Sequence, residues 1–169
     1  DRRAADPLGK GIDSLGQAIS EVRRISRDLR PGVLDDLGLG PALKTLVEEF
    51  SARTGIACKF NTVVFRNRLD NDAKIALYRI AQEALTNIER HAGATHVSID
   101  LRGHRRGATL RITDNGCGLD LRGGTQGLGL RNMQERMDQL GGRLQLRSSP
   151  GKGVEIEAIA TLTHMLPPT

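Results

Sequence analysis

Residues 77–91 read LYRIAQEALTNIERH, and this stretch decides how the sequence around it folds. At 100° per residue its apolar side chains fall on one stripe of an α-helix, formed by Leu77, Ala81, Ala84 and Ile88. Glu83, Asn87 and His91 are four residues apart, so they form a second, polar stripe beside the apolar one. The pattern predicts a helix from about Asn71 to His91 whose polar stripe borders the core.

That polar stripe is a candidate binding site. A carboxylate and an amide oxygen on one helix face, here Glu83 and Asn87, could hold a hard cation such as Mg²⁺ or polarise a water molecule. The Glu-x-x-x-Asn spacing is common, however, and by itself it is more typical of a solvated helix edge.

Outward from this helix, periodicity predicts three more helices and five strands. The helices are Leu8 to Arg30, Pro41 to Arg53 and Leu128 to Leu140. The strands are Ile56–Val64, Val97–Leu101, Leu110–Ile112, Arg143–Arg147 and Val154–Ala160. The strands come in pairs with few crossover helices. This order predicts an α/β two-layer sandwich with helices on one face of a mixed, mostly antiparallel sheet, and it argues against a doubly wound Rossmann domain.

The first predicted helix has a coiled-coil-like spacing of apolar residues. Its seam consists of Ile12, Leu15, Ile19, Val22 and Leu29, with Ser26 at the sixth place. Such a narrow stripe needs a partner helix; packing on its own domain is the alternative. Pro31 and Gly32 are expected to end the helix, and residues 29–40 are interpreted as a hinge-like connector.

Three glycine-containing segments are further candidates. In Asp114-Asn115-Gly116-Cys117-Gly118 an aspartate at a strand end can accept a hydrogen bond from an amine such as that of adenine, and glycines allow a flat ring to approach. Residues 123–130, GGTQGLGL, place glycines before a helix N-terminus, whose amides suit a phosphate. Gly151-Lys152-Gly153 fits a tight hairpin turn. Each segment alone is also typical of an ordinary turn or surface loop.

Composition narrows the function classes. The chain has 169 residues, a net charge of +5 and 2% aromatic residues. This size allows one domain with a helical appendage. Arginines scattered among acids, with few aromatic residues for base stacking, argue against nucleic-acid binding. No apolar run is long enough to span a membrane.

The two cysteines indicate the redox conditions in which the protein functions, and the first residue suggests that the sequence is part of a longer chain. Cys58 and Cys117 lack metal-site spacing and fit a reducing, cytoplasmic compartment. The sequence begins at Asp1, and we expect it to be part of a larger protein, which could be membrane-anchored.

The motifs and their order resemble the GHKL ATP-binding fold of sensor histidine kinases, DNA gyrase B, MutL and a heat-shock chaperone. Within it, the segments LRP (29–31), LDDLGL (34–39), YRIAQEALTN (78–87) and HA (91–92) resemble the NarX/LiaS-type subfamily of two-component sensors. This resemblance covers nearly the whole chain.

The resemblance implies a role for each motif residue. Asn87 matches the Mg²⁺-ligating asparagine, Glu83 the acidic residue that polarises the attacking group or a metal-bound water, and His91 a position near the phosphates. Asp114 matches the aspartate that binds the adenine amino group. The remaining nucleotide-site positions are Gly116 and Gly118 beside the base, Gly127, Leu128 and Gly129 in the lid, and Gly151 and Gly153 near the base.

The resemblance also implies an activity and a domain division. The activity is transfer of the ATP γ-phosphoryl group to a histidine on an upstream helix, for relay to a response regulator. Residues 1–32 would be part of the dimerisation hairpin that pairs with a second copy, 33–164 the catalytic domain and 165–169 a frayed tail. Because His91, His96, His104 and His164 do not lie on such a helix, we expect the chain to bind ATP without phosphorylating itself.

Two alternatives remain. One is a non-catalytic dimeric scaffold, which the intact Asn87, Asp114 and glycine pairs disfavour. The other is an ATPase of the gyrase or MutL type, disfavoured by the short lid of residues 119–126 and by the N-terminal helix.

Overall fold

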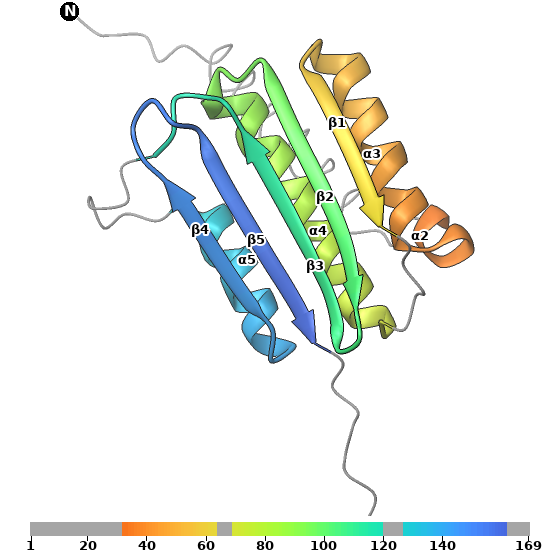
Figure 1. Cartoon of the computed structure of the whole chain (residues 1–169). Helices are drawn as coiled ribbons and strands as arrows, with labels where there is room; N and C mark the ends of the chain where they lie inside the picture. The colour runs from red at the N-terminus through yellow and green to blue at the C-terminus, as the bar shows by residue number, and fades with distance from the viewer. Residues whose placement is uncertain (1–31, 64–68, 120–126, 162–169) are drawn as a thin grey trace, which may run out of the picture.

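The computed structural model describes residues 32–63, 69–119 and 127–161, which form a sheet layer and a helical layer (Figure 1). The sheet has five strands in the order β1-β2-β3-β5-β4. Their bounds are β1 Ala57–Val63, β2 His96–His104, β3 Gly107–Asp114, β4 Arg143–Ser148 and β5 Val154–Thr161. β1 and β2 are parallel and every other pair is antiparallel, which confirms the predicted mixed, mostly antiparallel sheet.

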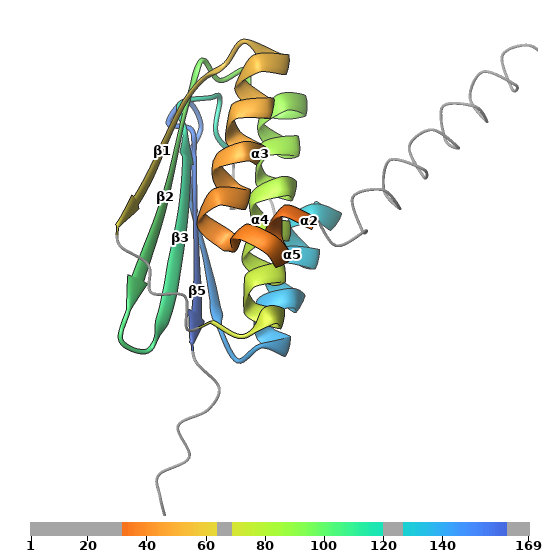
Figure 2. The ribbon, with the colours of Figure 1, turned by 90° about the vertical axis from the view of Figure 1, so that its right-hand side faces the viewer.

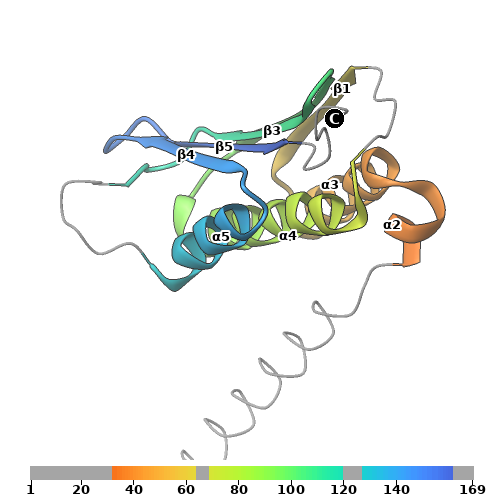
Figure 3. The same ribbon diagram turned by 90° about the horizontal axis from the view of Figure 1, so that it is seen from below.

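The helices cover one face of this sheet (Figures 2 and 3). They are α2 Gly32–Leu37, α3 Leu39–Thr54, α4 Asn71–Asn87, the π-helix η1 Ile88–Ala92 and α5 Leu128–Gln139. Seen from below, α3, α4 and α5 lie beneath the strands, and no described helix covers the other face of the sheet, which is called the open face below (Figure 3). The prediction of helices on one face is therefore confirmed.

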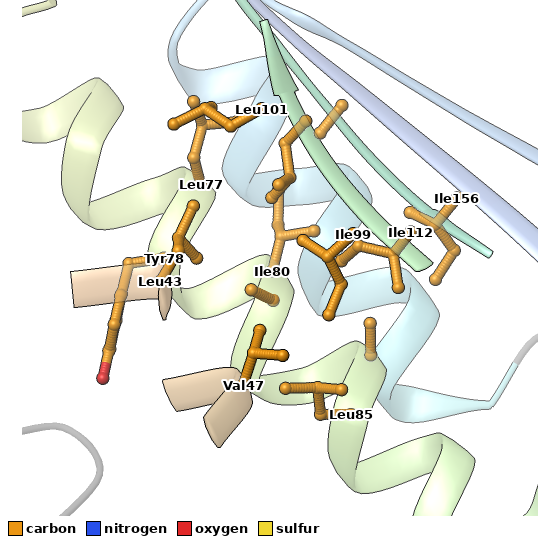
Figure 4. Packing of buried hydrophobic residues seen from close by; sticks show 14 of the residues in the cluster. Leu43, Val47, Leu77, Tyr78, Ile80, Leu85, Ile99, Leu101, Ile112 and Ile156 are labelled. Atoms are coloured by element: carbon orange, nitrogen blue, oxygen red, sulfur yellow. The ribbon is translucent and has the colours of Figure 1, made fainter. Parts of the chain in front are cut away.

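The core lies between the two layers. Alternate residues of the central strands face the helices, and Ile99 and Leu101 of β2 are fully buried there. Leu77 and Ile80 of α4 pack toward them, as Figure 4 shows. Each such buried side chain contributes about 1.5–3 kcal/mol of hydrophobic free energy. The apolar stripe predicted on α4 is buried in full, which fixes the rotation of that helix.

The open face of the sheet is polar, and several of its charges are paired across strands. Asn61 Nδ2 donates to Asp100 Oδ1 at 2.9 Å, and Arg147 Nη1 lies 2.9 Å from Glu155 Oε1. Arg111 pairs with Glu157 between them. These contacts join residues directly opposite each other on neighbouring strands, so both arginines are paired with acidic side chains.

The segment predicted as a hinge-like connector is instead mostly helical. α2 begins at Gly32, and α3 begins at Leu39 rather than Pro41, so only Gly38 separates them. Burial of Leu34 and Leu39 in the core outweighs the weak helix propensity of the glycines.

Two expectations lie outside the described residues: the helix from Leu8 to Arg30 and the tail 165–169. The lid is described only at Leu119, because 120–126 are outside too. Within the described ranges, no helix is both long enough and apolar enough to cross a membrane.

Candidate functional site

The last turns of α4 present the first candidate residues. Asp70 caps this helix by accepting a hydrogen bond from Ala73 N at 2.8 Å. With the apolar stripe buried, Glu83 and Asn87 are half-buried at the border between core and solvent. That position makes them available to a ligand while limiting the access of water.

The predicted helix to His91 is corrected after Asn87, where it continues as the π-helix η1. The carbonyl oxygens of its last residues reach the loop after β3. Ala92 O accepts from Cys117 N at 2.8 Å, and His91 O lies 3.3 Å from Cys117 Sγ. Such π segments often occur at functional sites. The contacts of η1 with Cys117 are long-range in sequence, so helical spacing does not reveal them.

Asp114 ends β3 and is the buried polar residue of the described segments, at 5% exposed. Gly116 N donates to its Oδ1 at 2.7 Å. Burial raises the pKa of this carboxyl, while backbone hydrogen bonds from Gly116 and Val154 act in the opposite direction. A shielded carboxylate with spare lone pairs is suited to accept a hydrogen bond from a ligand amine.

The β4–β5 hairpin closes the other side of the Asp114 loop. Gly151 N donates to Cys117 O at 2.6 Å, and Leu119 N donates to Ser148 Oγ at 2.7 Å. Gly153, at φ +70°, leaves no room for a Cβ atom, which would overlap the carbonyl oxygen of Asp114. The two turns are therefore fitted together through their backbones.

The first turn of α5 lies against Glu83 and Asn87. A Cβ atom on Gly129 would overlap Glu83 Oε1 and would stand 3.4 Å from Asn87 Nδ2. Residues 46 positions apart, Glu83 and Gly129, thus meet at one point of the structure.

The structure brings most predicted site residues together in two groups. The first, named the base group after the role that the resemblance implies for it, joins Asp114, Gly116, Gly118, Gly151 and Gly153, with the backbone of His91 and Ala92 at its edge. The second, named the phosphate group for the same reason, joins Glu83, Asn87 and Gly129. Gly127 has no described atom near its missing side chain, Leu128 is 74% exposed, and the His91 side chain is exposed.

Sequence reasoning missed Asn115 and Thr95. Asn115 belongs to the quoted Asp-Asn-Gly motif, whose pattern alone indicates no more than a turn. Its side chain instead binds the connection between η1 and β2. Thr95 carries no sequence signal of its own.

The residues of the phosphate group fit a magnesium ion. Glu83 and Asn87 offer oxygen ligands, which Mg²⁺ prefers. The described residues contain no group of three histidine, cysteine or acidic side chains placed to hold a metal. In proteins that use nucleotide substrates, Mg²⁺ usually binds through one or two carboxylates together with substrate phosphates and water.

Comparison with known proteins names the family. Residues 72–164 match the family described as "Histidine kinase-, DNA gyrase B-, and HSP90-like ATPase". This chain belongs to that family. The match begins in α4 and includes both groups of site residues. Membership in this ATPase family implies that the domain uses ATP.

The curated relatives to which the chain is similar are histidine kinases. The chain is 46% identical over 168 residues to "Sensor histidine kinase MctS" of Rhizobium johnstonii, covering 97% of this chain and 35% of that protein. It is 41% identical over 140 residues to "Signal transduction histidine-protein kinase/phosphatase DegS" of Brevibacillus brevis, covering 82% and 36%. For "Sensor histidine kinase ComP" of Bacillus subtilis the identity is 37% over 159 residues, covering 90% and 21%. The chain thus spans between 21% and 36% of these relatives.

Solved structures support the fold of this ATPase domain. The histidine kinase domain of the blue-light activated kinase from Erythrobacter litoralis EL346 superposes with a TM-score of 0.59 at 20% identity. The superposition covers 74% of this chain and 61% of that one. At this identity the likeness concerns the fold alone.

Proposed function

We propose that this chain is the catalytic, ATP-binding part of a two-component sensor histidine kinase. The observation that carries the proposal is the convergence of Asp114 at one end of η1 with Glu83, Asn87 and Gly129 at the other. The base group offers a shielded hydrogen-bond acceptor, which suits the adenine end of a nucleotide. The phosphate group offers oxygen ligands for a metal ion, which suits the triphosphate end. The sensor histidine kinases found among its relatives support the same function.

The base group would bind adenine. The Asp114 carboxylate accepts a hydrogen bond from the amino group, and the missing side chains of Gly116 and Gly118 allow the ring to approach the backbone. Gly151 and Gly153 hold the adjoining hairpin against this loop. Base recognition thus depends mainly on backbone that is already in place.

The phosphate group would hold the triphosphate. Asn87 supplies an amide oxygen for Mg²⁺, and Glu83 is placed to orient and polarise the attacking group. Mg²⁺, when bound, neutralises charge on the phosphate oxygens. Gly127, Leu128 and Gly129 begin α5, where free backbone amides favour anionic phosphate. His91, which the resemblance assigns to a position near the phosphates, has its backbone at the base-group end of η1.

The reaction would move the γ-phosphoryl group from ATP to a histidine nitrogen, releasing ADP. Among the described histidines, His91 lies in η1, and His96 and His104 are the two ends of β2, so none lies on an exposed coiled-coil helix. As the resemblance implies, we expect the acceptor on an upstream helix outside this chain. We assign residues 1–32 to the dimerisation hairpin, 33–164 to the catalytic domain and 165–169 to a tail; a second copy and a response regulator would be the partners.

Calorimetric titration with a non-hydrolysable ATP analogue tests the site. We expect binding that Mg²⁺ strengthens, and a loss of about 10-fold or more in the Mg²⁺-supported affinity in Asn87→Ala. Asn61→Ala is the matched control, because this asparagine lies on the open face of the sheet. Absence of binding by the folded wild-type chain would favour the scaffold alternative.

Incubation with radiolabelled Mg·ATP tests the reaction class. We expect neither phosphohistidine on the chain nor sustained ATP hydrolysis. Acid-labile phosphate on the chain would show that the acceptor is internal. Multiple-turnover hydrolysis without an acceptor would instead favour an ATPase of the gyrase type.

A further inference from the structure

Asn115 is the residue between the buried carboxylate of Asp114 and the tightly packed Gly116. Its side chain is exposed to solvent, yet it makes three hydrogen bonds to the segment before β2 and the start of that strand. Its Oδ1 accepts from Thr95 N at 3.0 Å and from His96 N at 2.9 Å. Its Nδ2 donates to Thr95 Oγ1 at 2.9 Å.

These three hydrogen bonds join two segments that are 20 residues apart in sequence. Thr95 lies in the short connection from η1 to β2, and Asn115 follows β3. The backbone adds a fourth bond from Asn115 N to His96 O at 3.3 Å. Since Asp114 pairs with Val97 in the sheet, this set of bonds begins where the sheet pairing ends.

The connection held by Asn115 leads directly back to the phosphate group. Ala92 and His91 end η1, and Asn87 precedes η1 by one residue. A shift of the connection at Thr95 would therefore move η1, and with it the end of α4, relative to Asp114. Cys117 reinforces the same junction through Ala92 O.

We propose that Asn115 is a positioning residue that fixes the distance between the base group and the phosphate group. It would touch neither adenine nor phosphate, and it would act through the backbone of Thr95 and His96. The inference rests on the proposed function, since it concerns a ligand that spans both groups. It predicts that Asn115 matters for a ligand that occupies both groups and much less for a ligand that occupies one.

The test compares two ligands on the same variants. Mg·AMP-PNP spans both groups, while adenosine occupies the base group alone. The affinity of Mg·AMP-PNP is measured by calorimetry and that of adenosine by ligand-observed NMR titration, which suits weak binding. The variants are Asn115→Ala and Asn115→Asp, with Asn61→Ala as a control that removes an asparagine side-chain hydrogen bond elsewhere.

We expect Asn115→Ala to weaken Mg·AMP-PNP by about 10-fold while adenosine changes by less than about 2-fold. Asn115→Asp retains the acceptor oxygen for both backbone amides and should recover most of the affinity. Asn61→Ala should leave both ligands unchanged. Melting temperature is recorded for each variant, so that general unfolding is recognised.

Equal loss of both ligands in a folded Asn115→Ala variant would overturn the inference, because it would show that Asn115 supports only the base loop. Unchanged affinity for both would overturn it as well. If the wild-type chain binds neither ligand, the proposed function itself fails. That outcome differs from failure of the inference, which concerns only how much more tightly Mg·AMP-PNP binds than adenosine in the Asn115 variants.

Discussion

The base group and the phosphate group are built in different ways. Around Asp114, backbone hydrogen bonds from Cys117 N to Ala92 O and from Gly151 N to Cys117 O link three segments, and Gly116 N donates to the Asp114 side chain, before any ligand is considered. Around Asn87, by contrast, the half-buried side chains of Glu83 and Asn87 lie where a side chain on Gly129 of α5 would stand. One end of the site is backbone fitted to backbone, and the other is side chain against helix.

This difference indicates a division of labour. A site built from backbone is preorganised and loses little entropy on binding. A site built from side chains at a helix start can adjust its shape to the ligand. Substitutions at glycines separate the two cases, because an added methyl group meets backbone at one end and a flexible carboxylate at the other.

The largest effect is expected for Gly153→Ala. The new Cβ atom would overlap the carbonyl oxygen of Asp114, and φ of +70° disfavours any side chain. We expect a loss of at least about 2 kcal/mol in the free energy of unfolding, measured by denaturant titration. Gly151→Ala is the matched control, because it has φ of +75° but open space, and it should lose only about 1 kcal/mol. Equal losses would show that the close packing of the two turns is unimportant.

Asp114→Asn should affect binding more than folding. The amide replaces a carboxylate acceptor, so we expect the affinity for an ATP analogue to fall about 10- to 100-fold. Asp36→Asn, at an exposed position of α2, is the control and should bind normally. Retained affinity in Asp114→Asn would remove Asp114 from the base site.

The pH dependence of stability tests the burial of the same carboxyl. Its pKa is raised from the ordinary value of 3.8, so the folded state binds the proton more strongly than the unfolded state. This contribution to stability is present below pH 3.8 and is lost as the pH rises through the folded pKa. The free energy of unfolding of the wild type relative to Asp114→Asn should therefore increase on acidification from neutral pH. A constant difference would contradict the burial of a charged Asp114.

Gly129→Ala is expected to alter the phosphate group without unfolding the chain. Its Cβ atom would displace the end of the flexible Glu83 side chain rather than backbone. We expect the increase in nucleotide affinity on adding Mg²⁺ to shrink about 2- to 10-fold, with little change in melting temperature. A large drop in melting temperature would instead mean that this contact is as rigid as those around Asp114.

The smallest effect is expected for Gly127→Ala. No described atom lies within 4 Å of the position of its Cβ atom, and its φ of −58° suits any residue. Stability and Mg²⁺-dependent affinity should both match the wild type within error, measured beside Gly129→Ala. Loss of affinity would indicate that nucleotide binding brings Gly127 into a close contact.

The fold and the residue types of the site could be predicted from the sequence because they depend on local periodicity. The helical period of 3.6 residues by itself places Leu77 and Glu83 on different faces of α4. The alternation of apolar residues predicts the strand at whose end Asp114 lies. The helix α2 and the π-helix η1 could not be predicted, because each depends on long-range contacts, of Leu34 with the core and of Ala92 with Cys117. For the same reason the glycines looked alike in sequence, whereas Gly153 and Gly127 prove to have opposite surroundings.

Amide hydrogen exchange followed by NMR, with and without Mg·AMP-PNP, tests the contrast between the two groups most directly. The account predicts that the amides of Gly116, Cys117 and Gly151 are protected without nucleotide, because each already donates a hydrogen bond. The amides of Leu128 and Gly129 should become protected only when the nucleotide is added. Rapid exchange at Gly116, Cys117 and Gly151 in the free chain, with protection appearing only on binding, would contradict a preformed base site.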